Sequence, residues 1–239
     1  MQLHLFSSPG AAPIQDIVAA CQPLLAGQPR PVVAYLPAAA IGNLWVEFTA
    51  EAFRDLAVVQ VIGVEKMARA EITAVLDNAS LLYIPGGNTF CLKQRLHERG
   101  LMAEIQARVR GGLPLVAFSA GTVLCGRNIL TTNDMNVCAA TDFAGLNLTH
   151  FNFNVHYPAQ EGEARQSRDD RLWEYHRFHD NPVLALADGA YILITESQVE
   201  LLQGACWRYD PGQARTRVEG GIVFGTAVKR PSPVGVESH

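Results

Sequence analysis

The chain lacks an excess of charge of either sign, and charged residues are few. Its 239 residues carry 19 lysines and arginines against 23 aspartates and glutamates, a formal net charge of −4. Nucleic-acid-binding proteins need a basic surface to neutralise phosphates, so this balance argues against nucleic acid as a partner. Charged residues make up 18% and hydrophobic residues 49%, which indicates a well-buried globular fold.

Long apolar runs and a leader-like amino terminus are also missing. No stretch approaches the roughly 20 apolar residues that a membrane-spanning helix needs. Residues 1–6 show no basic region followed by an apolar core. We therefore expect a cytoplasmic protein with no membrane partner.

Paired cysteine motifs are absent as well. The five cysteines show no C-x-x-C spacing, and their odd number favours reduced thiols over a disulfide framework or a zinc site. With nucleic acid, membrane and zinc disfavoured, the expected partner is a small molecule or a peptide.

The chain does contain apolar runs that alternate with helical patterns. Strand-like runs cover residues 3–6, 32–36, 58–61, 81–84 and 115–118, and helical patterns cover 14–25, 45–55, 68–78 and 90–109, the last interrupted at Arg99-Gly100. This alternation predicts an α/β fold with a doubly wound, mostly parallel sheet and helices on both faces.

No linker or repeat divides the chain, which predicts one domain over residues 1–239. Short strand-like runs at 183–186, 190–195 and 199–202 predict an antiparallel meander at the sheet edge, as a short carboxyl-terminal extension. Residues 229–239, rich in proline and glycine, predict a flexible tail.

The most informative segment is the strand-like run 115–118, which leads directly into Ser119, Ala120 and Gly121. Small residues at a sharp strand-to-helix turn allow a serine to stand out as a nucleophile. Ala117 occupies the place of the first glycine in the G-x-S-x-G pattern. A serine that caps the following helix fits the local pattern too, so both interpretations stay open at this point.

A second segment of interest is the glycine pair Gly86-Gly87, where a strand ends and a helix begins. Backbone N–H groups at such a turn can approach a substrate oxygen, and the helix start adds positive potential. The turn can therefore supply half of an oxyanion hole. The alternative is an ordinary tight turn with Asn88 or Thr89 as the helix cap.

His156 and Asp188 are the candidates for a base and an orienting acid. His156 ends an alternating run that Pro158 stops, although a lone histidine at a strand end is often structural. Asp188 follows an apolar strand and precedes Gly189, where its carboxylate can face a histidine. Asp-Gly is equally an ordinary hairpin turn.

Four segments, taken in order, resemble the peptidase E family of aspartyl dipeptidases. They are residues 86–89 (GGNT), 118–121 (FSAG), 131–135 (TTNDM) and 154–157 (NVHY), and the resemblance extends over residues 32–202. It implies a class I glutamine-amidotransferase-like fold in which serine replaces the amidotransferase cysteine. The implied activity is hydrolysis of dipeptides and short peptides that begin with aspartate.

The resemblance also implies roles for individual residues. Ser119 becomes the nucleophile, His156 the general base, and Asp188 takes the place of the glutamate that is usual in the family. The backbone N–H groups of Gly87 and Ala120 then form the oxyanion hole. This acyl transfer needs no metal and no other cofactor.

An N-terminal aspartate needs a fixed cation, and residues 162–172 are similar to an arginine-bearing segment of the family. We favour an arginine for this role because a guanidinium pairs bidentately with a carboxylate. Arg168 is the first candidate, and Arg171 and Arg165 are the next two. A solvated helix face of mixed charge is the alternative. Asn88 is a further substrate-binding candidate, and related enzymes leave a homodimer possible.

Two other functions stay open. A cyanophycinase-like hydrolase shares the serine turn and also handles aspartyl linkages, but acts on a long polymer rather than a small peptide substrate. A catalytically silent, amidotransferase-like binding protein would result if Asp188 could not reach His156.

Overall fold

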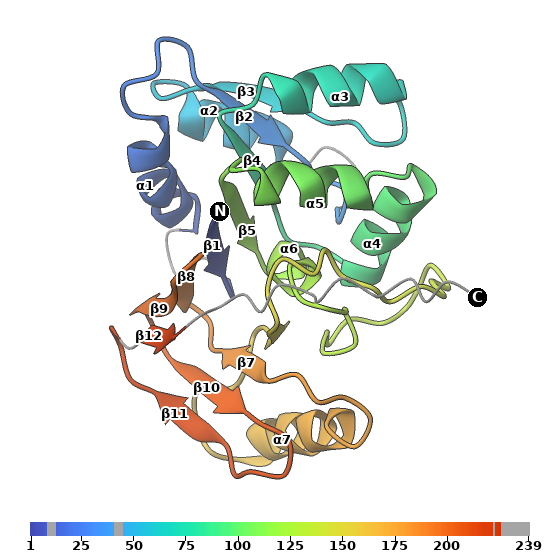
Figure 1. Cartoon of the computed structure of the whole chain (residues 1–239), viewed down its shortest axis with the longest axis vertical. Helices are drawn as coiled ribbons and strands as arrows, with labels where there is room; N and C mark the ends of the chain where they lie inside the picture. The colour runs from blue at the N-terminus through green and yellow to red at the C-terminus, as the bar shows by residue number, and fades with distance from the viewer. Residues whose placement is uncertain (9–12, 41–44, 222, 226–239) are drawn as a thin grey trace, which may run out of the picture.

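The computed structural model describes residues 1–8, 13–40, 45–221 and 223–225, so the predicted tail at 229–239 lies outside the described residues. These residues form an eight-stranded sheet and a four-stranded sheet (Figure 1). The larger sheet has the order β12-β9-β8-β1-β5-β4-β2-β3 and the smaller one the order β11-β10-β7-β6. The strands are β1 (Gln2–Phe6), β2 (Val32–Tyr35), β3 (Val58–Val61), β4 (Leu81–Ile84), β5 (Leu115–Phe118), β6 (Asn152–Asn154), β7 (Val183–Leu186), β8 (Tyr191–Thr195), β9 (Gln198–Gln203), β10 (Cys206–Tyr209), β11 (Thr216–Val218) and β12 (Val223–Gly225).

Helices cover both faces of the larger sheet, as predicted for a doubly wound α/β fold. The helices are α1 (Pro13–Leu25), α2 (Val46–Phe53), α3 (Arg69–Asp77), α4 (Thr89–Glu98), α5 (Met102–Arg110), α6 (Ala120–Leu124) and α7 (Glu163–Tyr175). Along β4, Leu82 and Ile84 join the core beneath α3 to α6, whereas Leu81 and Tyr83 face α1 and α2. This alternation follows from the period of two in a strand.

The five strands β3, β2, β4, β5 and β1 are parallel, which confirms the mostly parallel sheet. The predicted break in the long helical pattern is also present, because α4 ends at Glu98 and α5 begins at Met102. Gly100 lies between them with a φ of 64°, a conformation that favours glycine.

The predicted antiparallel extension is present, but only two of its three predicted strands belong to the larger sheet. Strands β8 and β9 form a hairpin on the larger sheet, where β8 pairs antiparallel with β1. Strand β7 instead lies in the smaller sheet between β6 and β10. All four residues of β7 are buried: Leu184 and Leu186 join the main core, and Val183 and Ala185 pack in the cluster beneath α7. A strand with two apolar faces needs cover on both, which the edge of a meander does not provide.

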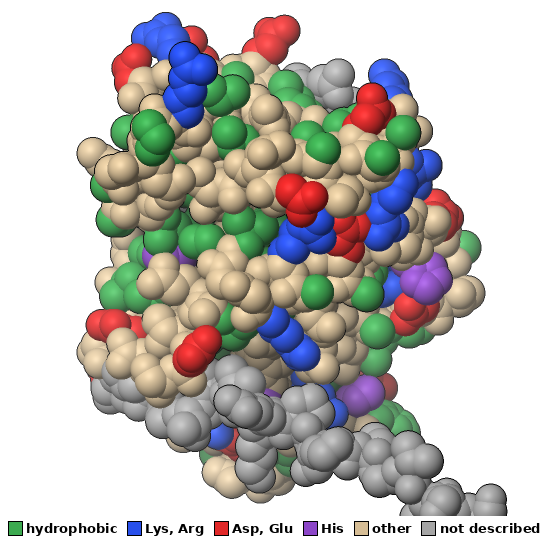
Figure 2. All heavy atoms as spheres, turned by 45° about the horizontal axis from the view of Figure 1, so that its top comes forward, with side chains coloured by type: hydrophobic (Ala, Val, Ile, Leu, Met, Phe, Trp, Pro, Cys, Tyr) green, Lys and Arg blue, Asp and Glu red, His purple; other side chains and the backbone are tan. Residues whose placement is uncertain are grey.

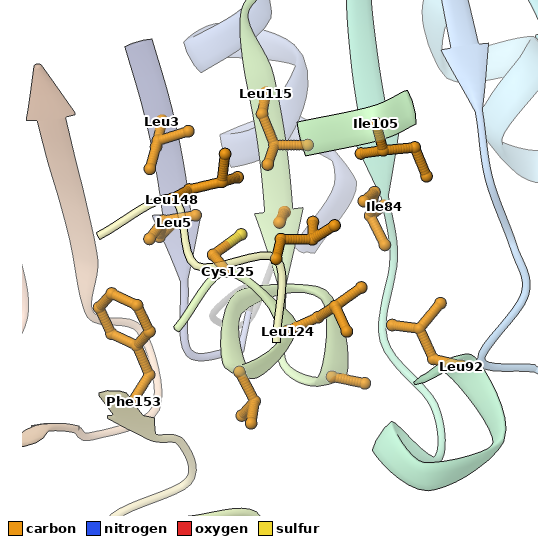
Figure 3. Close-up of a cluster of buried hydrophobic side chains, with 14 of the residues drawn as sticks. Leu3, Leu5, Ile84, Leu92, Ile105, Leu115, Leu124, Cys125, Leu148 and Phe153 are labelled. Carbon is orange, nitrogen blue, oxygen red and sulfur yellow. The ribbon is translucent and has the colours of Figure 1, made fainter. Parts of the chain in front are cut away.

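The strands and helices that carry the site share one core (Figure 3). Leu5 and Leu115 from the parallel strands pack in the same buried cluster as Leu124 of α6, Cys125 and Phe153 of β6. Each of these side chains has no accessible surface. Burial of one such side chain contributes roughly 1.5–3 kcal/mol, so the two sheets are held together firmly where the site lies.

The surface carries charges of both signs. On the face shown in Figure 2, side chains of lysine and arginine lie interspersed with those of aspartate and glutamate. Within the described part of the chain, no helix combines the length and the apolar character required to cross a membrane.

Candidate active site

Ser119 lies at a sharp turn between β5 and α6. Its φ of 50° and ψ of −113° fall in a sparsely populated region, which costs roughly 1–3 kcal/mol. The Ser119 N–H donates to the carbonyl of Phe6 at 3.0 Å, and this bond ties the turn to the end of β1. A Cβ atom on Gly121 would lie 2.3 Å from the carbonyl oxygen of Ile84, so any side chain there would force α6 away from β4.

The glycine turn after β4 lies directly against Ser119. A Cβ atom on Gly86 would come within 3.1 Å of the Ser119 Cβ, and one on Gly87 within 2.4 Å of the Ala39 oxygen. Gly87 also has a φ of 136°. Among the described residues, the N–H groups of Gly87 and Ala120 have no hydrogen-bond partner. Both amides are therefore available as hydrogen-bond donors.

His156 and Asp188 complete a continuous chain of hydrogen bonds from Ser119. The Ser119 Oγ lies 2.9 Å from His156 Nε2, and His156 Nδ1 lies 2.6 Å from Asp188 Oδ1. Because a carboxylate only accepts, Nδ1 carries the proton and Nε2 accepts from the serine hydroxyl. The side chains of His156 and Asp188 are 43% and 68% exposed, so a substrate can reach them from solvent.

The parallel pairing of β6 with β7 explains how the histidine and the aspartate meet. Asn154 pairs with Ala185, and each strand then runs on for a few residues in the same direction. His156 lies two positions after the end of β6, and Asp188 lies two positions after the end of β7. Neighbouring strand ends thus bring the two side chains together although 32 positions separate them.

The buried serine Ser7 also belongs to this arrangement, although no sequence pattern pointed to it. Its hydroxyl accepts the His156 N–H at 2.9 Å and donates to the Leu186 carbonyl at 2.9 Å. Ser7 simply follows strand β1 and belongs to no motif. Only long-range contacts reveal its place beneath the histidine.

Residues 131–135, which carried part of the resemblance, connect the glycine turn to β6. The Asp134 carboxylate accepts from the backbone N–H of Thr89 at 2.7 Å and from its hydroxyl at 2.6 Å, at the amino terminus of α4. A carboxylate is favoured there because the N–H groups and the helix dipole are positive. Asn133 donates to the Val155 carbonyl at 2.9 Å, next to His156.

Arg168 lies near this segment on α7. One of its guanidinium nitrogens, Nη1, is buried and has no hydrogen-bond partner in the described part of the chain. Burial lowers the pKa of Arg168, the neighbouring Arg171 lowers it further, and the Asp134 carboxylate opposes both effects. Arg168 is half-buried, whereas Arg171 is exposed.

The other two substrate-binding candidates are engaged in the fold. Arg165 is buried, donates to the Pro158 carbonyl at 2.9 Å, pairs with Glu161 and stacks over the Trp207 ring at 4.6 Å. Asn88 caps α4 by accepting from the Cys91 N–H at 3.0 Å, and its Nδ2 donates to the Met135 carbonyl at 2.9 Å.

A serine, a histidine and an aspartate bonded in this order, at the carboxyl edge of a parallel sheet, define the class of serine hydrolases. The sequence model of peptidase family S51 matches residues 5–202 of the chain. The chain belongs to peptidase family S51 and is a serine-type peptidase. This confirms the resemblance drawn from the four sequence segments.

Individual relatives agree with this assignment. Peptidase E of Pasteurella multocida is 33% identical over 187 residues, which are 76% of this chain and 79% of that protein. A probable alpha-aspartyl dipeptidase of Drosophila melanogaster is 40% identical over 131 residues, 53% of this chain and 55% of that protein. The crystal structure of a putative peptidase E from Listeria monocytogenes has a TM-score of 0.67 at 23% identity, covers 84% of this chain and 98% of that one, and supports the fold.

Proposed function

We propose that this chain hydrolyses dipeptides or short peptides with an N-terminal aspartate, through an acyl-enzyme. The observation that carries the proposal is the buried Arg168 nitrogen, which has no partner among the described residues and lies on the helix that follows the catalytic histidine. A buried cationic donor without a partner is costly, and a substrate carboxylate would satisfy it. The name of the Drosophila relative, an alpha-aspartyl dipeptidase, points to the same substrate class.

The acyl-transfer step uses the hydrogen-bonded chain at the turn. Ser119 Oγ attacks the scissile carbonyl carbon while His156 Nε2, 2.9 Å away, takes the hydroxyl proton. Asp188 accepts the hydrogen bond from His156 Nδ1–H and stabilises the imidazolium. As the C–N bond breaks, His156 returns the proton to the leaving amine. His156 then takes a proton from the water molecule that attacks the acyl-serine ester, and it returns this proton to Ser119 Oγ as the free acid leaves.

The oxyanion that forms in both steps lies between two backbone donors. In this proposal the donors are the N–H groups of Gly87 and Ala120, which have no partner in the part of the chain that the structure describes. Preorganised donors of this kind contribute about 3–4 kcal/mol each to transition-state stabilisation.

Specificity comes from Arg168 in this proposal, with exposed Arg171 adding positive potential beside it. Arg165 is not available, because its guanidinium is engaged with Glu161, Pro158 and Trp207. Asn88 binds substrate through the second hydrogen of its amide nitrogen, since the first is bonded to Met135.

Of the two other candidate functions, one loses its premise and the other is tested together with the proposal. The silent binding protein required Asp188 to be out of reach of His156, and the 2.6 Å contact removes that premise. The cyanophycinase-like function uses the same serine turn on the aspartyl linkages of a long polymer, so cyanophycin is included in the test.

Hydrolysis of Asp-Leu tests the proposal when it is compared with Leu-Asp, Asn-Leu, N-acetyl-Asp-Leu and cyanophycin. Asp-Leu should be the preferred substrate, and Arg168→Met should lower its kcat/KM by about 100-fold or more because two charge-assisted hydrogen bonds are lost. The same variant should gain relative activity on Asn-Leu. Ser119→Ala should abolish both turnover and labelling by a serine-directed fluorophosphonate.

Arg177→Met is a matched control, because Arg177 is an exposed arginine just beyond the end of α7. It should leave kcat/KM within about twofold, as surface substitutions usually have small effects. Equal loss in both variants would show that Arg168 has no specific role. Turnover of cyanophycin without turnover of Asp-Leu would replace the dipeptidase function with the polymer hydrolase.

A further inference from the structure

The segment after β1 lies beneath both the base and the acid of the proposed triad. The Ser7 N–H donates to the Ala190 carbonyl at 3.0 Å, and the Gly189 N–H donates to the Ser8 carbonyl at 3.2 Å. Residues 7 and 8 are thus bonded to the turn that carries Asp188. The Ser7 side chain adds a third bond, to the Leu186 carbonyl at 2.9 Å.

His156 leaves its strand in an unusual conformation. Its φ is 54°, which is uncommon for a residue other than glycine and which turns its backbone away from the ladder with β7. The next residue, Tyr157, still donates its N–H to the Leu186 carbonyl at 2.9 Å. The His156 N–H instead donates a hydrogen bond to the Ser7 hydroxyl, at 2.9 Å.

One buried hydroxyl therefore bridges the base and the acid. Ser7 has no accessible surface, so in the folded chain bulk solvent does not compete with its hydroxyl for the His156 N–H. Through Leu186, it also fixes the end of β7, two residues before Asp188. Together these two contacts help to fix the position of the His156 ring relative to the Asp188 carboxylate.

We infer that Ser7 is a positioning residue for the base and acid of this peptidase, an inference that rests on the proposed function. Its hydroxyl holds His156 in the positive-φ conformation that directs Nε2 to Ser119 and Nδ1 to Asp188. It touches neither substrate nor the reacting atoms, and acts through the histidine backbone. A displacement of about 1 Å at a catalytic group costs on the order of 100-fold in rate.

Ser7→Ala tests this inference, with Ser80→Ala as a matched control. Ser80 accepts the Val32 N–H at 3.1 Å, a similar bond at the opposite end of the sheet, just before β4. Ser7→Ala should lower kcat for Asp-Leu by roughly 10- to 100-fold and leave KM within about twofold, since substrate contacts are intact. Ser80→Ala should leave both constants near the wild-type values.

Two further variants separate positioning from a loss of folding. Ser7→Thr keeps the hydroxyl and should restore most of the lost kcat. Ser7→Cys keeps the approximate size with a weaker acceptor, and gives the same comparison if Ser7→Ala does not fold. Thermal melts of all variants show whether each is folded at the assay temperature.

The rate of Ser119 labelling by a fluorophosphonate makes the outcome independent of peptide specificity. Labelling of folded Ser7→Ala should slow by the same factor as kcat, because both need His156 in place. If wild type is labelled but does not hydrolyse Asp-Leu, the proposed function fails while the labelling test of Ser7 stands. Wild-type labelling rates in Ser7→Ala, or an equal loss in Ser80→Ala, would overturn the role of Ser7.

Discussion

At the residue scale, the site depends on two strained backbone conformations. Ser119 and His156 both have positive φ, at 50° and 54°. Conformations of this kind cost roughly 1–3 kcal/mol each and persist only where neighbouring contacts enforce them. Here Phe6 binds the Ser119 N–H and Ser7 binds the His156 N–H. The strain is thus concentrated at the two residues that must meet for proton transfer.

The length of the acidic side chain is also decided at this scale. Asp188 is one methylene shorter than the glutamate that the resemblance implies at this position. Because β6 and β7 are hydrogen-bonded neighbours, the turn at Asp188 lies close enough for the shorter chain to reach His156 at 2.6 Å. An aspartate at this turn is therefore long enough to orient the histidine.

His4 provides a residue-scale prediction about pH. It is buried in β1, its Nδ1 lies 2.5 Å from the Tyr191 hydroxyl, and burial lowers its pKa from 6.5 to about 4. Between these values the unfolded chain binds a proton that the folded chain does not, so stability falls as pH falls. The full contribution is present above pH 6.5 and amounts to about 3 kcal/mol.

Urea unfolding of wild type and His4→Phe at pH 7 and pH 4 measures this effect. Other groups titrate in the same interval, so the informative quantity is the difference in unfolding free energy between the two proteins. That difference should move by about 3 kcal/mol in favour of the variant as the pH is lowered. A difference that does not vary with pH would contradict the prediction.

At the element scale, the parallel strands were predicted well. The runs 58–61, 81–84 and 115–118 coincide with β3, β4 and β5, because short apolar stretches bounded by turn residues define strands. Strands β10 to β12 were not predicted. Strands β10 and β11 mix apolar residues with polar ones such as Arg208 and Thr216. The structure of such segments is decided by the strands with which they pair.

Gly121 provides an element-scale prediction, because it sets the distance between α6 and β4. Its missing side chain allows the helix to pass close to the Ile84 carbonyl, where a Cβ atom would lie only 2.3 Å away. Gly121→Ala should therefore push α6 outward, cost roughly 1–3 kcal/mol of stability, and displace the Ser119 turn. Chemical unfolding and the rate of fluorophosphonate labelling measure the two effects.

Gly220→Ala is the control for this substitution. Gly220 has an ordinary φ, and a Cβ atom added there would meet no described atom within 4 Å, so alanine fits without strain. The variant should be neutral or more stable by up to about 1 kcal/mol. If Gly121→Ala matched it in stability and labelling, the close approach of α6 to β4 would have no importance.

At the scale of the whole molecule, a buried charge network joins α7 to the smaller sheet. Asp169 is 1% exposed and accepts hydrogen bonds from the Tyr157 and Tyr209 hydroxyls, each at 2.5 Å. Arg215, next to β11, pairs with the same carboxylate. Burial and the bond to Asp169 raise the pKa of Tyr157 to about 12 and raise that of Tyr209 as well, so both tyrosines act as neutral donors.

Arg215→Met should destabilise the protein because it leaves the Asp169 carboxylate buried without a cation. Loss of one partner of a buried pair costs about 3–5 kcal/mol, and the partial exposure of Arg215 reduces our expectation to roughly 2–4 kcal/mol. Arg217→Met changes an exposed arginine of β11 and should stay within about 0.5 kcal/mol of wild type. Equal unfolding free energies for the two variants would show that the network adds no stability.

The sequence by itself determined the parallel half of the fold, the Ser119 turn and the glycine turn. Each of these depends on local chemistry: apolar runs form buried strands, and small residues permit tight turns. Strand-end patterns also selected His156 and Asp188 as candidates, and the resemblance to the family assigned their roles.

Tertiary structure alone decided how these pieces meet. It separated β7 from β8, placed Ser7 beneath His156, left Arg168 Nη1 without a partner among the described residues and engaged Arg165 in the fold. The physical reason is that these contacts join residues far apart in the chain. Ser7 and His156 are 149 positions apart, and no local pattern of hydrophobicity or spacing records such a hydrogen bond.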